Sequence, residues 1–315
     1  MYNPDSKGIP YGNGLLILIG LWLAGFLVGS AIAIPIWLVM TGKSLMKMPT
    51  EMLLPENVNA LRVIQVVSTL VIFFLPAYFT ALIINRKPLK LLGFNTRFNA
   101  KQVLLSLVII FCAALVAGSL AEINEMIPIP KSWATFFKGL EDDYAAQVEA
   151  ISNMKTFGDY IISIVMIALL PAVFEETFFR GGMQNLLTRS TKNPWLSIII
   201  TSIIFSIIHL SYYGFLARVC LGIVLGLIYH YSRSIWLNIA AHFFNNAFAV
   251  TQLYVLLQKG KSIKDAMNDK WPLWAGLIAI VVLYALFIVF KKLSVQSIQA
   301  YTPPEEKALE EKWIA

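Results

Sequence analysis

Long apolar runs constrain this chain more than any other feature of its sequence. The first run covers residues 15–40, which is 26 residues without a charge. A helix needs about 20 mostly apolar residues to cross the hydrocarbon of a bilayer. Runs near that length lie at residues 15–40, 63–84, 102–121, 160–178, 195–211, 215–231, 235–257 and 271–290. Because a helix satisfies its own backbone hydrogen bonds in lipid, we expect an all-α, polytopic membrane helical bundle of about eight transmembrane helices.

Composition supports a membrane protein and argues against a nucleic-acid-binding one. Hydrophobic residues make up 58% of the 315 residues, against roughly 45–50% in soluble domains. The net charge is +7, but the basic residues lie in short loops between apolar runs, as in membrane proteins. Cys112 and Cys220 both lie inside such runs, which disfavours a structural disulfide. We expect no nucleic-acid partner and an uncleaved first helix, with cleavage near the small residues 31–33 as the alternative.

Loop charges predict the orientation of the chain in the cell membrane. Eight spans place 14 of the 25 Lys and Arg residues on the side of the termini and 11 on the other. The short, early loop 85–101 is rich in basic residues, and such loops are typically cytoplasmic. We therefore expect a multi-pass protein with both termini in the cytoplasm. The acidic segment 122–159 would face outward as a solvated loop with a short surface helix.

Charged residues in the fourth run are the first indication of a functional site. Glu175, Glu176 and Arg180 follow directly on an apolar helix, where three charges would cost on the order of 8–10 kcal/mol near the bilayer centre. Glu176 and Arg180 are four residues apart and can pair on one helical face. Glu175 points about 100° away and has no partner on its own helix. The alternative is that the run has already ended and these groups lie at the water interface.

Two histidines on later runs add to this site. His209 lies in the fifth run, and His242 lies in the seventh run with Asn246 four residues after it on the same face. A desolvated carboxylate is a stronger base and can take a proton from water. An imidazole can orient that water, and two convergent donors can stabilise an oxyanion. His230 stands between two tyrosines, where an interfacial aromatic belt is expected, and we interpret it as structural.

These residues form an ordered three-part pattern: Glu175-Glu176-x-x-x-Arg180, then Phe205-x-x-x-His209, then His242-x-x-x-Asn246. The pattern resembles that of the CAAX-protease and bacteriocin-processing (CPBP, or Abi) family of intramembrane endopeptidases. The resemblance covers about residues 155–257. It implies a catalytic core of four spans at 155–257. The remaining runs lie outside the resemblance, and from the sequence we expect an N-terminal membrane region at 1–154 with three spans and an acidic extramembrane loop, and a last span with a charged cytoplasmic tail at 258–315.

The resemblance also implies a role for each site residue. Glu175 and His209 would hold and activate the attacking water, while His242 and Asn246 would stabilise the oxyanion. Glu176, Arg180 and Phe205 would be supporting residues. The family's site lies within the membrane and opens to the cytoplasmic side.

The metal requirement and the depth of the site stay open at this point. We expect no cofactor; zinc is the alternative, with Glu175, His209 and His242 as ligands, although the helical His-Glu-x-x-His arrangement of many zinc proteases is absent. Simple spans would also leave His209 and His242 mismatched in depth by roughly 10 Å. Either the fifth run enters deeper or the link 180–194 dips into the bundle.

The sequence therefore predicts an intramembrane peptidase that hydrolyses membrane-associated proteins or peptides with glutamate-activated water, as a CAAX prenyl endopeptidase does. Its partners would be such a substrate and the lipid bilayer. One alternative is a non-catalytic membrane scaffold or bacteriocin-immunity binding protein. The other is a proton-coupled transporter in which Glu175 and the histidines form a relay.

Overall fold

The computed structural model describes residues 5–151, 154, 156–260 and 272–301, and within these no β-strand forms. Residues 302–315 of the predicted tail lie outside the described residues. The described elements are α1 (Tyr11–Thr41), η1 (Leu45–Lys47), α2 (Met48–Glu51), η2 (Pro55–Asn57), α3 (Val58–Thr69), η3 (Leu70–Phe74), α4 (Leu75–Ile84), α5 (Pro88–Leu91), α6 (Ala100–Glu125), α7 (Lys131–Ile151), α8 (Phe157–Ser163), η4 (Ile164–Leu169), α9 (Leu170–Glu176), η5 (Thr177–Gln184), α10 (Asn185–Thr191), α11 (Pro194–Ile207), α12 (Phe215–Ser232), α13 (Ile235–Gln258) and α15 (Leu273–Tyr301).

The all-α prediction is confirmed for the described residues, and each of the eight apolar runs forms helix. Six helices are long and apolar enough to span a membrane, as judged by length and composition. The other two predicted spans are α11, an apolar helix of 14 residues, and α13, which has 24 residues. His209 lies just after α11, and His242 and Asn246 lie on α13.

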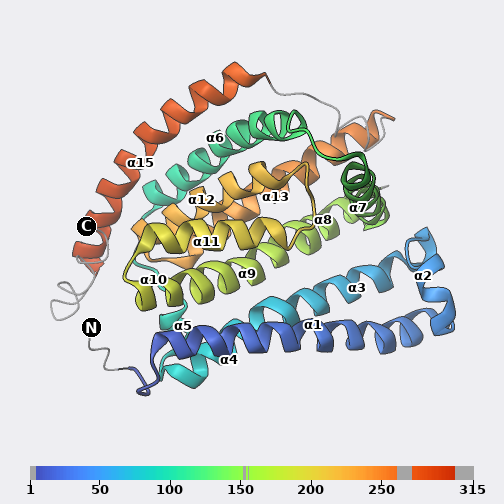
Figure 1. The fold of residues 1–315 in the computed structure, drawn as a ribbon, viewed down its shortest axis with the longest axis horizontal. Coiled ribbons are helices and arrows are strands. Elements are labelled where there is room, and N and C mark those ends of the chain that lie inside the picture. Colours follow the sequence, from blue (N-terminus) through green and yellow to red (C-terminus); the bar gives the residue numbers. More distant parts are fainter. Residues whose placement is uncertain (1–4, 152–153, 155, 261–271, 302–315) are drawn as a thin grey trace.

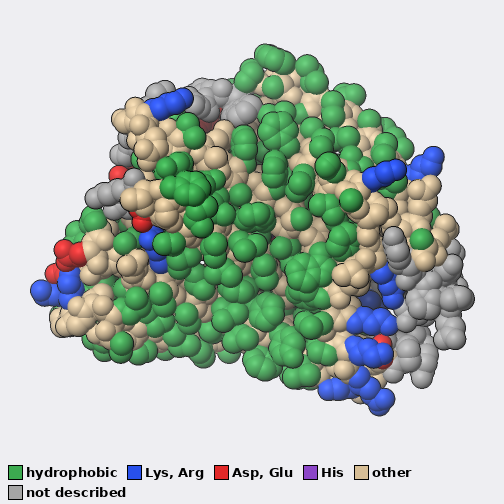
Figure 2. Space-filling model, turned by 180° about the vertical axis from the view of Figure 1, so that it is seen from behind, with side chains coloured by type: hydrophobic (Ala, Val, Ile, Leu, Met, Phe, Trp, Pro, Cys, Tyr) green, Lys and Arg blue, Asp and Glu red, His purple; other side chains and the backbone are tan. Residues whose placement is uncertain are grey.

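The helices lie in a bundle with their axes roughly along one direction (Figure 1). The pair made by α1 and α3–α4 flanks one side, and α6 and α15 flank the other. Between them lie α9, α11, α12 and α13, so the predicted catalytic core occupies the middle of the bundle. Apolar side chains cover the broad face between the two ends (Figure 2), as expected of a surface in contact with lipid.

The two ends of the bundle differ in charge. One end carries the start of α1 and the turns at 85–99, 192–193 and 233–234, where basic side chains gather (Figure 2). The opposite end carries the turn after α1, the turn between α11 and α12, and helix α7. Acidic residues of the described chain concentrate at that opposite end: Glu51, Glu56, Glu122, Glu125, Glu141, Asp142, Asp143, Glu149 and Asp159.

The acidic segment is more helical than expected. Instead of a solvated loop with a short surface helix, it contains α7, a helix of 21 residues. Phe137 of α7 stacks on Tyr212 with ring centroids 4.9 Å apart, and the Ser211 hydroxyl donates a hydrogen bond to Glu141. Asn124 at the end of α6 also donates to the Tyr212 carbonyl at 3.0 Å. These contacts hold the α11–α12 turn, which lies directly after His209.

Close packing of α11 on α12 depends on glycine, as the spacing of Gly222 and Gly226 predicts. A Cβ at Gly222 would lie 2.8 Å from the Cβ of Ser202, and one at Gly226 would lie 2.8 Å from the Ile198 side chain. Both distances are shorter than any ordinary Cβ contact. The small residues therefore let α11 and α12 approach closely.

Gly222→Val should destabilise the protein, because the new methyl groups must displace the α11 backbone. Overpacking of this kind typically costs about 1–3 kcal/mol, and we expect a lower midpoint of thermal unfolding in detergent. Gly20→Val is the matched control, since nothing lies within 4 Å of its Cβ position. Equal midpoints for the two variants would contradict the close helix contact.

Candidate functional site

The helix that carries the glutamate pair continues through the site without a break. Elements α8 to α10 form one helix of 35 residues, Phe157–Thr191, in which η5 is π-helical. Short π-helical segments inside helices occur often at functional sites. Glu176 and Arg180 are fully buried. The helix therefore does not end before these residues, as the alternative of a site at the water interface assumed, and both side chains are enclosed by the protein.

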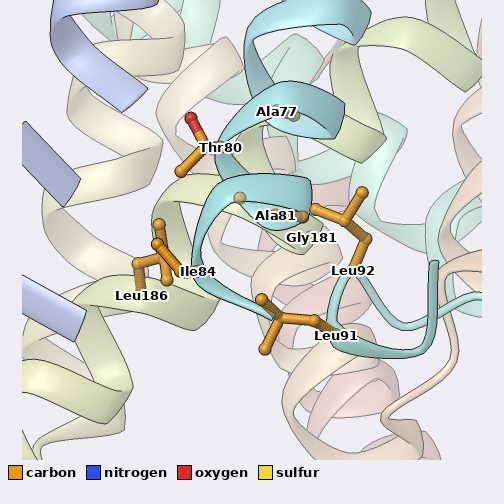
Figure 3. Close-up of a pocket in the computed structure, with 9 residues that line it drawn as sticks. Ala77, Thr80, Ala81, Ile84, Leu91, Leu92, Gly181 and Leu186 are labelled. Atoms are coloured by element: carbon orange, nitrogen blue, oxygen red, sulfur yellow. The ribbon is translucent and has the colours of Figure 1, made fainter. Parts of the chain in front are cut away.

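The glycine pair after Arg180 serves packing and does not end the helix. A Cβ at Gly181 would lie 2.7 Å from the backbone oxygen of Leu92, and one at Gly182 would lie 3.3 Å from Leu18. A small pocket lies beside this contact, lined by Ala77, Thr80, Ala81, Ile84, Leu91, Leu92, Gly181, Gly182 and Leu186 (Figure 3). Its lining is almost wholly apolar, so it offers no group for acid–base chemistry.

Glu176 is the centre of a buried polar network. Its carboxylate accepts hydrogen bonds from Arg180 Nη1 at 2.8 Å and from Asn238 Nδ2 at 3.3 Å. His242 Nδ1 lies 2.7 Å from the same carboxylate. The predicted ion pair of Glu176 with Arg180 is thus present. Arg180 also donates from Nη2 to the Gly222 carbonyl at 3.2 Å, which ties the network to α12.

The network fixes His242 in a defined orientation toward Glu175. Because Nδ1 faces the Glu176 carboxylate, that nitrogen is assigned as the donor. Nε2 then points toward Glu175, with Nε2 and Oε2 4.0 Å apart. The Glu175 side chain is 14% exposed, and it makes no hydrogen bond in the described part of the chain. Its carboxylate is therefore desolvated on most sides but free to act on a reacting molecule.

His209 lies in the turn after α11, and its ring and that of His242 both lie near Phe205. Its ring centroid is 4.8 Å from that of Phe205, and the His242 centroid is 6.2 Å from the same ring. His209 Nδ1 lies 2.6 Å from the Phe205 carbonyl, to which it donates, so Nε2 is left as an acceptor. The next residue, Leu210, has a φ of 50°. Such backbone strain in a side chain other than glycine is common at functional sites.

The position of His209 along the bundle follows from the lengths of the two helices that meet at the turn 192–193. Glu175 stands 17 residues before Lys192, and His209 stands 16 residues after Asn193. With a rise of 1.5 Å per residue, both lie about 25 Å from the same turn. Residues 180–191 of the link are helix and residues 192–193 form the turn, so the link does not dip as a loop, and the two residues come level in an antiparallel pair.

His242 reaches the same region although it lies only seven residues into α13. Ser234 and Ile235, at the start of α13, are fully buried. The Ile235 N–H donates to the Gly93 carbonyl at 2.9 Å, and the Ser234 hydroxyl donates to the Asn95 carbonyl at 2.8 Å. A loop thus covers the turn, so α13 begins inside the protein rather than at its edge.

Asn246 lies one turn after His242 on α13, as predicted, and it is half-buried. Its side-chain oxygen accepts a hydrogen bond from Asn245 Nδ2 at 3.4 Å. Among the described contacts, none joins it to Glu175 or the histidines.

His230 is buried near Tyr231, Arg233 and Lys291 at the basic end, which separates it from the site.

Two polar residues of the site were missed in the sequence. Asn238 stands four residues before His242, a spacing that extends the polar face of α13 by one turn, and it joins Glu176 to the Leu225 carbonyl at 2.7 Å. Arg218 is the one Lys or Arg between residues 215 and 231, and its charge interacts electrostatically with Glu175 and His209. A lone charge within a span was the available signal.

A metal site does not follow from the arrangement of these side chains. Of the residues that the structure describes, no three His, Cys, Asp or Glu side chains are grouped to hold a metal ion. The set considered for zinc (Glu175, His209 and His242) does not form such a group. His242 already uses Nδ1 on Glu176 and could offer a metal only Nε2.

Comparison with known proteins places the site in a family. Residues 157–248 match the Rce1-like family, described as type II CAAX prenyl endopeptidase. This match supports the resemblance of the segment to the CPBP family. The family implies a protease of the CAAX type that acts in the membrane. No curated protein sequence and no solved structure matches the chain. The matched segment contains all three parts of the motif, from Glu175 to Asn246.

Proposed function

We propose that the chain is an intramembrane peptidase that uses water activated by Glu175 to hydrolyse peptide bonds of membrane-associated proteins or peptides. The observation that supports this most is the free carboxylate of Glu175, held 4.0 Å from an imidazole whose other nitrogen is bound by Glu176. Carboxylates without hydrogen-bond partners are rare in apolar surroundings unless they have a function.

The water would bind between Glu175 and His209. Glu175 takes the proton, while His209 Nε2 accepts a hydrogen bond from the same water and fixes its direction toward the scissile carbonyl. Hydroxide adds to that carbonyl carbon, and the carbonyl oxygen becomes the oxyanion. Glu175 then returns the proton to the leaving amine, so that the bond breaks into an amine and a carboxylic acid, which loses its proton to water and leaves as a carboxylate.

His242 and Asn246 would stabilise the oxyanion. With Nδ1 donating to Glu176, His242 can donate from Nε2 when the ring is protonated, and the Glu176 carboxylate stabilises that imidazolium. Asn246 would present its amide to the same point from one turn further along α13. Arg180 keeps the Glu176 carboxylate charged within the bundle.

The charge of the two ends supports an orientation with both termini in the cytoplasm, because the basic end holds the start of α1 and the end of α15. The protein would then be a multi-pass protein of the cell membrane. Cysteine accessibility at Lys87→Cys and Asp143→Cys in intact cells tests this, with labelling by an impermeant reagent expected at position 143 alone.

The function is tested by peptide hydrolysis with purified protein in liposomes, using quenched peptides with and without an S-prenylated cysteine. We expect cleavage by the natural chain and none by Glu175→Ala. A non-catalytic scaffold would give no cleavage while Glu175→Gln retained cellular function. A transporter would give proton-coupled flux and no cleavage.

Removal of metal should leave this activity unchanged. The proposed steps use only side chains of the chain, so prolonged incubation with a strong chelator should change the cleavage rate by less than about twofold. Loss of activity in chelator that zinc restores would contradict a metal-free mechanism and would assign Glu175, His209 and His242 to a metal.

A further inference from the structure

Arg218 is a charged side chain of the site to which the proposed reaction gives no role. It stands in the first turn of α12, whose bounds are Phe215–Ser232. Its guanidinium folds back over Gly214, where an added Cβ would lie 2.2 Å from Nη1 and 2.9 Å from Cζ. The side chain thus points away from the rest of α12 and toward the turn that holds His209.

The guanidinium has hydrogen-bonding capacity that the described residues do not use. Arg218 Nη1 is buried and lacks a hydrogen-bond partner among the described side chains and backbone. Arg180 differs in its terminal nitrogens, because Nη1 and Nη2 donate to Glu176 and to the Gly222 carbonyl, although its Nε also lacks a partner among the described residues. Buried cationic donors nearly always have partners in folded proteins, so the terminal nitrogen of Arg218 beside the reactive site is available to a bound molecule.

The charges around Arg218 show what kind of molecule would bind there. Its positive charge interacts with Glu175 and with His209, the two residues proposed to hold the water. A peptide with its scissile carbonyl at these residues would place a neighbouring group against the guanidinium. The planar fork of an arginine matches a carboxylate, which can accept two parallel hydrogen bonds.

We propose that Arg218 binds a carboxylate of the substrate next to the scissile bond and thereby selects anionic peptides. This inference rests on the proposed peptidase function and adds a specificity residue to it. The carboxylate has two sources, the free C-terminus of a peptide cut near its end or an acidic side chain. Arg218 is then a substrate-binding residue, whereas Glu175 and His209 act on the water.

The test compares three quenched peptides that differ only near the cut. One ends in a free carboxylate, one ends in an amide, and one ends in an amide but carries an aspartate beside the cleavage position. With the natural chain, we expect one carboxylate peptide to have a kcat/KM about 10- to 100-fold above that of the plain amide. Whichever carboxylate peptide is preferred identifies the source.

Two variants should remove this preference by different routes. Arg218→Gln removes the charge, and Gly214→Ala keeps the charge but displaces the guanidinium by its Cβ. For both, the ratio of kcat/KM between the preferred peptide and the plain amide should fall to about one, mainly through a higher KM. Arg233→Gln, at the other end of α12, is the matched control and should keep the ratio of the natural chain.

The outcomes separate this inference from the proposed function. If the variants slow all three peptides equally, Arg218 is a counter-ion of Glu175 or stabilises the oxyanion, and carboxylate selection is overturned while peptidase function stands. If no peptide is cleaved, the same three peptides are titrated against Glu175→Gln protein, and Kd is measured by tryptophan fluorescence. Carboxylate-dependent binding that Arg218→Gln abolishes supports the inference without the peptidase function, and its absence overturns it.

Discussion

Replacing Glu175 by Gln should lower the rate of peptide cleavage by about 10²- to 10⁴-fold, the usual contribution of a general base. Gln has nearly the same shape but cannot take a proton from water. Since Glu175 makes no hydrogen bond in the described part of the chain, its replacement leaves no partner unsatisfied. The fold should therefore be retained, and the loss should appear in kcat with little change in KM.

The comparison is made at saturating peptide with protein of matched thermal stability. Glu149→Gln on the exposed face of α7 is the matched control and should retain full activity. His230→Ala should also cleave at the rate of the natural chain. If Glu175→Gln retains more than about a tenth of the natural rate, another group activates the water.

Replacing Glu176 by Gln should destabilise the fold by about 3–5 kcal/mol, because it leaves the buried charge of Arg180 without a counter-ion. Both side chains are fully buried, and their closest atoms are 2.8 Å apart. The same change removes the charge that holds His242 Nδ1. We expect a lower unfolding midpoint in detergent or, if the variant fails to fold, loss of monodisperse protein.

The double variant Glu176→Gln/Arg180→Met separates the effect of the unpaired Arg180 charge on stability from the effect of the lost carboxylate on His242. Removing the arginine as well removes the unpaired charge, and apolar replacement of a buried pair is often tolerated. We expect the double variant to regain most of the stability lost in Glu176→Gln while cleavage stays low, because His242 remains without its carboxylate. If the double variant is no more stable than Glu176→Gln, the unpaired Arg180 charge is not the cause of the lost stability.

Apolar run length and helical spacing were enough to predict much of this structure. All eight runs form helix in the described chain, and the spacing of Glu176 and Arg180 correctly predicted their ion pair. The predicted packing role of Gly222 is also confirmed by the distance to Ser202. Each of these three features depends on the spacing of residues along one helix, which can be read from the sequence.

Features that depend on contacts between distant segments could not be predicted. Only the approach of Leu92, about 90 residues earlier in the chain, shows why a glycine stands at position 181 within the continuing helix. The position of His242 along the bundle depends on residues 93–95, because they cover the start of α13 and let that helix begin inside the protein. Arg218 resembles a side chain that reaches the interface from a helix end, and its orientation over Gly214 needs coordinates.

The most direct test of the central claim is a single turnover of peptide in water enriched in ¹⁸O, with protein in excess over substrate. Activation of water by Glu175 predicts one ¹⁸O atom in the new carboxylate of every product molecule, and no product from Glu175→Gln. Product that carries only ¹⁶O in the first turnover, with the label found on the Glu175 side chain instead, would contradict the account.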